Sequence, residues 1–586
     1  MQEKNFIIFL ILSVIIIFIW STFFMPKPKV VPKPGDTQAG STMSQVTPPP
    51  SGGTAPAAGS TAPPPSSLPG GTASAPAMAE TPQGPTVKVV TDVAEVELTP
   101  FGAAPLSWKL TQFPKQKCYK YRINIEWPPL KVNPPCDTSP VDLVEDGSHY
   151  PNLPFMAEVS VDGDKVPMSA TWEAEAPEGL DLRDGATAGQ VVFRTAMEDG
   201  RVLKKIYRFK KDRYDVGLTF RVEGGETPQR AQADVAMFYK WSPDSKSRVP
   251  RWNYNGPEAH NGNALMQMKP DKVIKVPFET RESVIWAGFS YDYFLTAVVA
   301  GDTSRFVFTT KYIGTEAQKK DKKAEKDFVG WARIAATSHE LESGEVARAV
   351  LFMGPKQKDI LTGVSPSLRY SIDYGMLKIL VLPLLEALDW INAAVHNFGV
   401  SIIILTVVLR MAMFPLTRKS QKSMKDMQKL QPEIKALKEK YPDDKVKQNE
   451  EMQALWRKHK INPAMGCLPM LLQMPVFFAF YKALLISIEL RQAPFFGWIV
   501  DLSERDPLYI WPVLMGATQF ITQKMTPTQM DPMQQKVFLV MPIIFMYILR
   551  DFPSGLLIYW TVQNIVGIGQ QLYVNQQKDL TDVKGK

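Results

Sequence analysis

Arg410 lies in an apolar run, SIIILTVVLRMAMFPL, that is otherwise suited to cross a lipid bilayer. A guanidinium stays charged at any physiological pH. Placing one near the middle of a bilayer costs from about 3 to more than about 10 kcal/mol unless water or protein surrounds it. The alternative is that Arg410 only reaches the membrane surface, but Pro415, Arg418 and Lys419 already mark that surface further along the chain. We therefore expect the helix carrying Arg410 to face a water-filled cavity.

Other apolar segments also contain polar side chains that could line one groove with Arg410. A single such group can equally be a helix–helix hydrogen bond, worth about 0.6 kcal/mol on average. Together they favour a shared hydrophilic path. These residues are Thr406, Gln473, Gln519, Gln523, Gln563 and Asn564.

The signatures of common enzyme classes are missing from the sequence. It contains no HExxH, GxSxG or P-loop pattern, and no GxGxxG after a predicted strand. The five histidines are scattered along the chain, so a metal site or an acid–base pair is not predicted. We expect neither an enzyme nor a cofactor.

The N-terminal segment 1–25 contains an uncharged stretch of twenty residues, long enough to cross a bilayer. A cleaved signal peptide is the alternative, but no small-x-small cleavage site follows, so we expect an uncleaved transmembrane anchor. Residues 26–85 are rich in Pro, Ala, Gly and Ser and have few bulky apolar groups. This composition predicts a disordered linker.

Residues 86–360 show short runs that alternate between apolar and polar side chains, separated by Gly, Asp and Pro turns. Alternation with a period of two in Val-, Phe-, Tyr- and Thr-rich runs is typical of strands and predicts a large β-sandwich. Cys118 and Cys136 fall in this region, where they could form a disulfide in an oxidising compartment or remain free thiols.

The chain becomes strongly apolar again after residue 374. Charged side chains recur on one side of 374–398, which predicts an amphipathic helix in the membrane interface. Residues 399–575 contain the Arg410 run and four further apolar segments, giving five spans here and six in the whole chain. The further segments are Cys467–Ile488, Leu508–Ile521, Val537–Leu549 and Leu556–Leu572.

Some of these segments are short for a bilayer. Val537–Leu549 has thirteen residues, or about 20 Å of helix against a hydrocarbon core of about 30 Å. This mismatch favours local thinning of the bilayer. The alternative is that the helix continues through less apolar residues such as Lys536 and Arg550.

The charges of the loops orient the spans. From Arg418 to Lys460 there are thirteen Lys or Arg against seven Asp or Glu, whereas between Ile488 and Leu508 there are two against four. Positively charged loops stay in the cytoplasm. The first loop and both termini are therefore predicted to be cytoplasmic and the β domain extracytoplasmic.

The cytoplasmic segment 419–462 has apolar residues at helical spacing on both sides of a break at Tyr441-Pro442. This pattern predicts two antiparallel amphipathic helices. The hairpin could receive a ribosome, a nascent chain or an anionic lipid surface, or it could simply pack on itself. Its candidate contact residues are Met424, Met427, Ile434, Leu437, Leu455 and Trp456.

Several strings resemble the YidC/Oxa/Alb family of membrane insertases. They are SIIILTVVLRMAMFPLT, INPAMGCLPMLLQMPVF, ELRQAPFFGWIVDLS, DPMQQK and FPSGLLIYW. The resemblance covers residues 375–572 and is highly specific there. Over the β domain it rests on size and position, which are similar to those of Gram-negative bacterial members.

The resemblance implies a six-helix α-helical membrane protein with a five-helix insertase core and a large periplasmic all-β super-sandwich domain. It implies a substrate-binding groove open to cytoplasm and lipid and closed to the outside, with Arg410 as the groove arginine and Thr406 and Gln473 at polar groove positions. Gln519 looks like a further polar groove position. The pair Tyr559-Trp560 falls where relatives contact the entering segment.

The implied function is that of an inner-membrane insertase and chaperone that works alone or with the Sec translocon. Its implied partners are nascent membrane proteins, SecYEG and SecDF, and membrane lipids, with no direct nucleic-acid binding. Many relatives end in a long basic tail that binds ribosomes, whereas only the short cytoplasmic tail 576–586 follows here. Ribosome docking through the tail is therefore not expected to be strong.

Two other classes of protein remain as alternatives. A secondary transporter with a periplasmic binding domain would need inverted repeats and intramembrane carboxylates, neither of which is evident. A periplasmic scaffold that is merely anchored would not retain a buried arginine. Lys482 adds a second intramembrane cation, which we expect to extend outward to water.

Overall fold

The fold is taken from a computed structural model of the chain. The structure describes residues 85–583 apart from two sets of positions: the segments 117–136, 145–151, 242–253, 302–304, 314–325, 336–340, 462–467 and 527–531, and the single residues 281, 443 and 460. The predicted anchor 1–25, nearly all of the linker 26–85, and the residues Cys118 and Cys136 lie outside the described part.

The period-two runs of the sequence form strands whose apolar residues alternate with exposed ones. In β2 (Ala94–Thr99) the side chains of Val96 and Leu98 are buried, whereas Glu95 and Glu97 between them are partly exposed. Successive side chains of a strand point to opposite faces of a sheet. The alternation therefore places one face of β2 in a core and leaves the other towards solvent.

The strands of the described residues form three sheets, and in these every pairing is antiparallel except that of β1 with β8. The five-stranded sheet has the order β4-β3-β2-β1-β8. Its strands are β1 (Val87–Val90), β2, β3 (Ala104–Pro114), β4 (Pro140–Asp142) and β8 (Leu180–Asp181).

The nine-stranded sheet has the order β14-β13-β16-β17-β20-β11-β10-β9-β7. Its strands are β7 (Glu173–Ala174), β9 (Ala188–Ala196), β10 (Val202–Lys210), β11 (Asp215–Glu223), β13 (Gly256–His260), β14 (Leu265–Gln267), β16 (Trp286–Ser290), β17 (Phe294–Ala300) and β20 (Glu345–Pro355).

The six-stranded sheet has the order β15-β18-β19-β12-β5-β6. Its strands are β5 (Ala157–Val161), β6 (Asp164–Val166), β12 (Ala231–Trp241), β15 (Phe278–Glu279), β18 (Arg305–Tyr312) and β19 (Lys326–Ala335). The described part of the domain also contains the short helices α2 (Pro270–Val273) and α5 (Lys358–Val364) and the 3-10 helix η1 (Leu368–Ser371).

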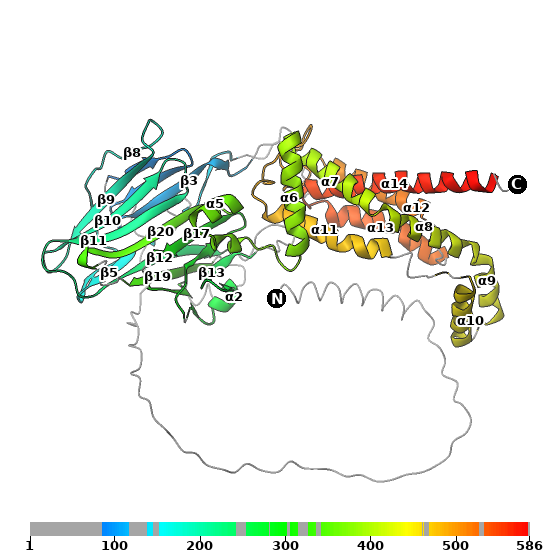
Figure 1. The fold of residues 1–586 in the computed structure, drawn as a ribbon, viewed down its shortest axis with the longest axis horizontal. Helices are drawn as coiled ribbons and strands as arrows, with labels where there is room; N and C mark the ends of the chain where they lie inside the picture. Colours follow the sequence, from blue (N-terminus) through cyan, green and yellow to red (C-terminus); the bar gives the residue numbers. More distant parts are fainter. Residues whose placement is uncertain are drawn as a thin grey trace, which may run out of the picture.

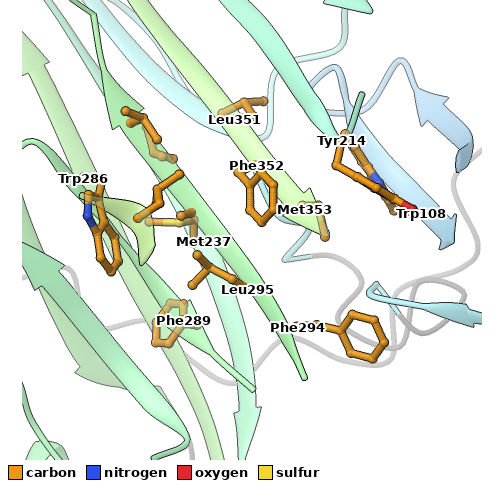
Figure 2. Close-up of a cluster of buried hydrophobic side chains, with 14 of the residues drawn as sticks. Trp108, Tyr214, Met237, Trp286, Phe289, Phe294, Leu295, Leu351, Phe352 and Met353 are labelled. Atoms are coloured by element: carbon orange, nitrogen blue, oxygen red, sulfur yellow. The ribbon is translucent and has the colours of Figure 1, made fainter. Parts of the chain in front are cut away.

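Aromatic side chains between the sheets show how the layers pack. Phe289 of the nine-stranded sheet stacks on Tyr239 of the six-stranded sheet, with ring centroids 5.0 Å apart and planes 4° from parallel. Trp108 of the five-stranded sheet packs on Phe209 of the nine-stranded sheet at 6.3 Å. Figure 2 shows the same apolar layer, with Met237, Phe289, Leu295 and Phe352 gathered between the ribbons. The β-sandwich predicted from the sequence is confirmed.

The chain from Lys378 onward is helical and lies beside the β domain (Figure 1). Helix α6 crosses the ends of the other helices, between them and the β domain, and the α9–α10 pair lies at the far end. The helices are α6 (Lys378–Val395), α7 (Phe398–Ala412), α8 (Phe414–Lys429), α9 (Gln431–Lys440), α10 (Lys445–Lys458), α11 (Leu468–Ile486), α12 (Ile510–Met525), α13 (Pro532–Leu549) and α14 (Ser554–Val583).

Among the described residues, no single helix has both the length and the apolar composition required of a membrane span. Helices α7 and α8 satisfy that requirement only together, with a bend of 58° between them, and two shorter apolar stretches lie at Leu471–Ile486 and Phe538–Leu549.

Several helices differ in extent from the predicted spans. The thirteen-residue segment Val537–Leu549 is part of an 18-residue helix, α13, which begins at Pro532. At about 1.5 Å per residue this helix is about 27 Å long. The helix therefore continues through Lys536, as the alternative stated from the sequence has it, while its apolar stretch Phe538–Leu549 is shorter than a membrane span. Helix α14 has 30 residues, so most of the predicted tail 576–586 continues the last helix.

The predicted two-helix hairpin consists of three helices. Its first arm divides at Leu430, where α8 ends and α9 begins with Pro432 in its first turn. Proline has no backbone N–H to donate to the preceding turn, so it is well placed at a helix start and interrupts a continuing helix. Only α9 pairs with α10, and Met424 and Met427 lie on α8.

Candidate functional site

Arg410 lies in the last turn of α7, immediately before the 58° bend into α8. The sequence predicted that Arg410 lies in the middle of an uninterrupted span, whereas the structure places it next to a bend. The last carbonyl groups of a helix carry a partial negative charge that stabilises a cation by about 0.3–1 kcal/mol. The position of Arg410 at this helix end therefore offsets part of the cost of its charge.

The guanidinium group of Arg410 begins a chain of polar contacts that joins three helices. Its Nη1 donates to Oε1 of Gln473 on α11 at 3.4 Å. The Nε2 of Gln473 in turn donates to the hydroxyl of Tyr559 on α14 at 3.0 Å. The Nε2 of Gln570, also on α14, donates to the backbone carbonyl of Arg410 at 3.2 Å. Residues far apart in sequence therefore converge on one cation.

The hydrogen-bonding capacity of Arg410 is not filled by the described part of the chain. Its Nε is buried and has no partner there. No carboxylate among the described residues lies within ion-pair distance of the guanidinium, although such pairs occur elsewhere in the protein. Leaving a buried donor unsatisfied costs about 1–3 kcal/mol. The site therefore retains a capacity to bind an anionic or hydrogen-bond-accepting group.

Gly567 of α14 makes room for this guanidinium. A Cβ atom at position 567 would overlap the Nη2 atom of Arg410, whereas a Cβ at Gly569, two residues further on, would meet nothing within 4 Å. Sequence reasoning missed Gly567. The available signal was the pair Gly567 and Gly569 inside a predicted helix, where glycine is unfavourable unless packing or function requires it.

Tyr559 forms the aromatic side of the Arg410 cluster. Its ring is only 2% exposed and stacks on Phe480 of α11, with centroids 4.7 Å apart and planes 17° from parallel. This packing fixes the position of the hydroxyl that accepts from Gln473. Tyr559 therefore orients the polar groups beside Arg410 rather than presenting a free ring.

Trp560 and Gln519 belong to a second polar cluster, between α12 and α14. The indole Nε1 of Trp560 donates to Oε1 of Gln519 at 3.1 Å. One turn further along α14, Nδ2 of Asn564 donates to Oγ1 of Thr518 at 3.2 Å. The Trp560 ring also packs edge-on against Phe477 of α11 at 4.9 Å. Adjacent residues of α14 thus face different neighbours.

Thr406 does not join either cluster through its hydroxyl. The side chain is fully buried, and its Oγ1 donates to the carbonyl of Ile402 in the same helix at 2.6 Å. Threonine in a helix commonly satisfies itself in this way. Gln523 and Gln563 are also buried, and each has one polar side-chain atom, Oε1 and Nε2 respectively, that has no partner in the described part of the chain.

The apolar residues of the hairpin are buried to different degrees. Ile434 of α9 is buried, whereas the other five predicted contact residues are partly exposed. Polar contacts also join the two arms, since Nε2 of Gln448 reaches the carbonyl of Lys438 at 3.5 Å and His459 lies 3.9 Å from Glu433. The helices α9 and α10 thus pack on each other while keeping part of their apolar surface accessible.

Lys482 on α11 does not extend into water, although the sequence predicted that it would. It is only 6% exposed, and its Nζ lies 3.2 Å from Oδ2 of Asp373 in the segment that leads into α6. An ion pair with a carboxylate from outside the helix compensates a buried ammonium. The sequence contained no sign of this partner, because the two residues are far apart in the chain.

Two family models match successive parts of the chain between residues 135 and 581. The model described as "YidC periplasmic domain" matches residues 135–387, and the model described as "60Kd inner membrane protein" matches residues 390–581. The boundary between them falls within α6, where the β domain gives way to the helices.

Two curated relatives match along their full length. A protein from Pelobacter propionicus is 36% identical over 602 aligned residues, which cover 98% of this chain and 99% of the relative. A protein from Syntrophus aciditrophicus is 34% identical over 578 residues, covering 98% of this chain and 100% of the relative. Both are named "Membrane protein insertase YidC".

The chain belongs to the YidC family of membrane insertases. The resemblance recognised from the sequence is confirmed, and it extends over the β domain as well as the helices. The model that matches the β domain describes a periplasmic domain, and the model that matches the helices describes an inner-membrane protein. The architecture of a periplasmic β-sandwich joined to an insertase helix bundle is the one that the structure displays (Figure 1).

Proposed function

We propose that this protein inserts membrane proteins into the bacterial inner membrane and assists their folding, without catalysing a chemical reaction. The cluster of Arg410, Gln473 and Tyr559 forms the hydrophilic groove that receives the client. The observation that supports this proposal is a guanidinium that has no carboxylate partner in the described part of the chain and whose buried Nε has an unfilled donor.

Arg410 lowers the cost of moving a client's polar segment out of water. An acidic or hydrogen-bond-accepting stretch of the client replaces water at the guanidinium, so its desolvation is compensated inside the groove. The apolar part of the client then leaves for lipid. Burial of about 20 apolar residues in hydrocarbon supplies the driving force, so no nucleotide is required.

The apolar part of the client moves along α13. Its side chains Val540, Ile543, Tyr547 and Ile548 are each between 49% and 64% exposed. Phe545 of the same helix contacts Trp560, with ring centroids 6.0 Å apart. The second cluster, formed by Gln519 and Trp560, therefore contacts the helix that carries this apolar face. Thr406, with its hydroxyl bonded within α7, contributes to packing beside the groove.

The proposal includes the topology that the charges predict. The chain crosses the membrane six times, both termini and the hairpin 419–462 are cytoplasmic, and the β domain is periplasmic. The hairpin receives nascent chains on its partly exposed apolar residues, among them Met424, Met427, Leu455 and Trp456. The Sec translocon components SecYEG and SecDF are partners for larger clients.

The experiment that tests the proposal replaces Arg410 in cells depleted of the wild-type protein. Matched single-span clients with an acidic or a neutral translocated segment are followed by protease accessibility. Arg410→Ala should reduce insertion of the acidic client by about tenfold, which corresponds to about 1.4 kcal/mol, and affect the neutral client less. Arg410→Lys should retain part of the activity, because the charge remains while the planar donor geometry is lost.

Two outcomes would contradict the proposal. Equal loss for both clients would exclude attraction of the acidic segment as the role of Arg410. Normal insertion of all clients on depletion, combined with lost uptake of a solute, would instead favour a secondary transporter.

A further inference from the structure

The segment 487–509, between the end of α11 and the start of α12, is an ordered loop that contacts three separate parts of the protein. It packs on the N-terminal ends of α7 and α14, and it also contacts the β domain. The Arg410 cluster lies towards the other end of these two helices, since Arg410 is in the last turn of α7. We call this segment the 487–509 loop.

Three hydrogen bonds hold the loop to the first turn of α14. The Oγ of Ser554 donates to the carbonyl of Asp501 at 3.0 Å, and the backbone N–H of Ser554 donates to the carbonyl of Glu504 at 2.7 Å. The N–H of Gly555 donates to the carbonyl of Leu502 at 3.0 Å. The first N–H groups of a helix lack partners within the helix, so the loop supplies what α14 needs in order to begin there.

The carboxylate of Asp501 organises the loop from inside. It is 6% exposed, and its Oδ1 accepts from the N–H of Gln492 at 2.9 Å and from both the N–H and Oγ of Ser503 at 2.8 and 2.7 Å. Gln492 has a φ of +59°, a left-handed conformation that most side chains disfavour. The hydrogen bond that its backbone N–H donates to Asp501 holds this strained residue in place.

Apolar side chains of the loop close the space beneath these hydrogen bonds. Phe495 lies so close to Gly399 of α7 that a Cβ there would overlap its ring. Leu490, Ile499 and Leu502 are each at most 2% exposed. The apolar side chains of the loop are therefore closely packed against the N-terminal end of α7.

The β domain rests on the other side of the same loop. The Nε2 of Gln492 donates to the carbonyl of Pro114, the last residue of β3, at 2.7 Å. The Nη2 of Arg491 donates to the same carbonyl at 2.9 Å, and its guanidinium lies 5.7 Å from the ring centroid of Phe294. The side chain of Gln492 therefore contacts the β domain, while its backbone N–H binds Asp501. The backbone carbonyl of Asp501 in turn accepts a hydrogen bond from α14.

We propose that the 487–509 loop is a latched plug that seals the helix bundle against ions at the end opposite Arg410, with Asp501 as the latch and the β domain holding it shut through Gln492 and Arg491. The proposal rests on the proposed groove, because a hydrated guanidinium within the bundle needs a dry barrier on one side to prevent leakage. Asp501 and Gln492 are positioning residues that have no contact with the client.

The test measures proton flux in vesicles that contain the purified full-length protein. The vesicles are made of phosphatidylethanolamine and phosphatidylglycerol, and a potassium gradient with valinomycin provides the driving potential. Asp501→Ala removes the acceptor of three hydrogen bonds and should raise proton flux by about tenfold over wild type. Asp501→Asn keeps an oxygen acceptor of the same size and should restore a tight vesicle.

Two milder variants keep the test decisive if Asp501→Ala fails to fold. Ser554→Ala removes a single bond to the loop and should raise flux by a smaller factor. Gln492→Gly removes the side chain that reaches Pro114 while glycine accepts the positive φ without strain, so any leak it causes reports on the β-domain contact alone. A leak in Gln492→Gly supports the role of the β domain, and flux equal to wild type overturns that part.

Insertion of an acidic client into the same vesicles separates this inference from the proposed function. Folded Asp501→Ala and Ser554→Ala variants that are as tight as wild type would overturn the plug, whatever happens to insertion. If Arg410→Ala leaves insertion of the acidic client intact, the groove proposal fails, and with it the reason given for a seal.

Discussion

At the scale of single residues, the protein keeps a cation where burial makes it costly. Arg410 is compensated by the carbonyl end of α7 and by Gln473, but its Nε remains without a partner in the described part of the chain. A design for stability alone would replace such a group with a well-packed apolar side chain. Because the protein retains Arg410 despite its energetic cost, we infer that the side chain has a role in binding a client.

The position of this guanidinium depends on Gly567. Gly567→Ala should push the Nη2 end of Arg410 away from Gln473 and reduce insertion of acidic clients about two- to fivefold, in line with the loss of one hydrogen bond. Gly569→Ala is the matched control, because its Cβ would meet nothing and alanine favours the helix. Insertion assays with both variants check this. Equal behaviour of the two would show that close approach at position 567 is irrelevant.

Glu258 of β13 makes the stability of the β domain dependent on pH. Burial raises the pKa of Glu258 to about 7, although the nearby Lys356 acts in the opposite direction. Between about pH 4.5 and 7, the folded protein therefore keeps a proton on Glu258 that the unfolded chain has already released. The stabilising contribution is complete below about pH 4.5 and is lost as the pH rises through about 7.

Thermal unfolding of the full-length protein in detergent at pH 5 and pH 8 checks this prediction. Wild type should unfold at a lower temperature at pH 8, and Glu258→Gln should show a smaller difference between the two pH values, because a neutral amide cannot titrate. An undiminished pH dependence in the Gln variant would assign the effect to other groups.

At the scale of elements, α6 is an amphipathic helix with one face against the protein. Val381 and Leu388 are buried, whereas Ile379 and Trp390 are 78% and 80% exposed. Large apolar side chains that remain exposed at helical spacing indicate a surface for lipid. The predicted interfacial helix is consistent with this arrangement, and its contact with lipid remains a prediction.

Trp390 provides the measurement. Lipids brominated near the headgroup should quench part of the tryptophan fluorescence of wild type in vesicles, and Trp390→Phe should lose that quenched part while keeping its fold, since the side chain contacts little of the protein. If quenching is the same in both proteins, α6 does not lie in the interface.

At the scale of the whole molecule, the β domain and the helices are joined by specific polar contacts. Lys482 of α11 pairs with Asp373, and Arg491 of the 487–509 loop bonds to the end of β3. Figure 1 shows α6 and this junction between the two halves. Buried ion pairs add little net stability, but they specify geometry when both partners are present.

A double-mutant cycle measures the coupling across this junction. Asp373→Asn and Lys482→Met should each destabilise the protein, and the double variant should be less destabilised than the sum by about 1–3 kcal/mol, because the two charges no longer need each other. Unfolding of the purified full-length protein provides the free energies. Strict additivity would mean that the pair does not couple the two halves.

The sequence by itself determined the type of each region. The period-two alternation predicted the strands of the β-sandwich, because the two faces of a strand meet different environments whatever the sheet order. The apolar runs predicted helices, and the short strings around Arg410 and Tyr559 predicted the family. These features are local, so they can be read without knowing which segments become neighbours.

Only the tertiary structure decided which side chains meet. Arg410, Gln473 and Tyr559 converge from three helices, whereas Thr406 turns back to its own helix and Trp560 joins Gln519 instead. Such partners depend on helix rotation and on bends such as the one after α7, which are fixed by packing between distant segments. For the same reason the partner of Lys482 and the space at Gly567 were visible only once the helices were assembled.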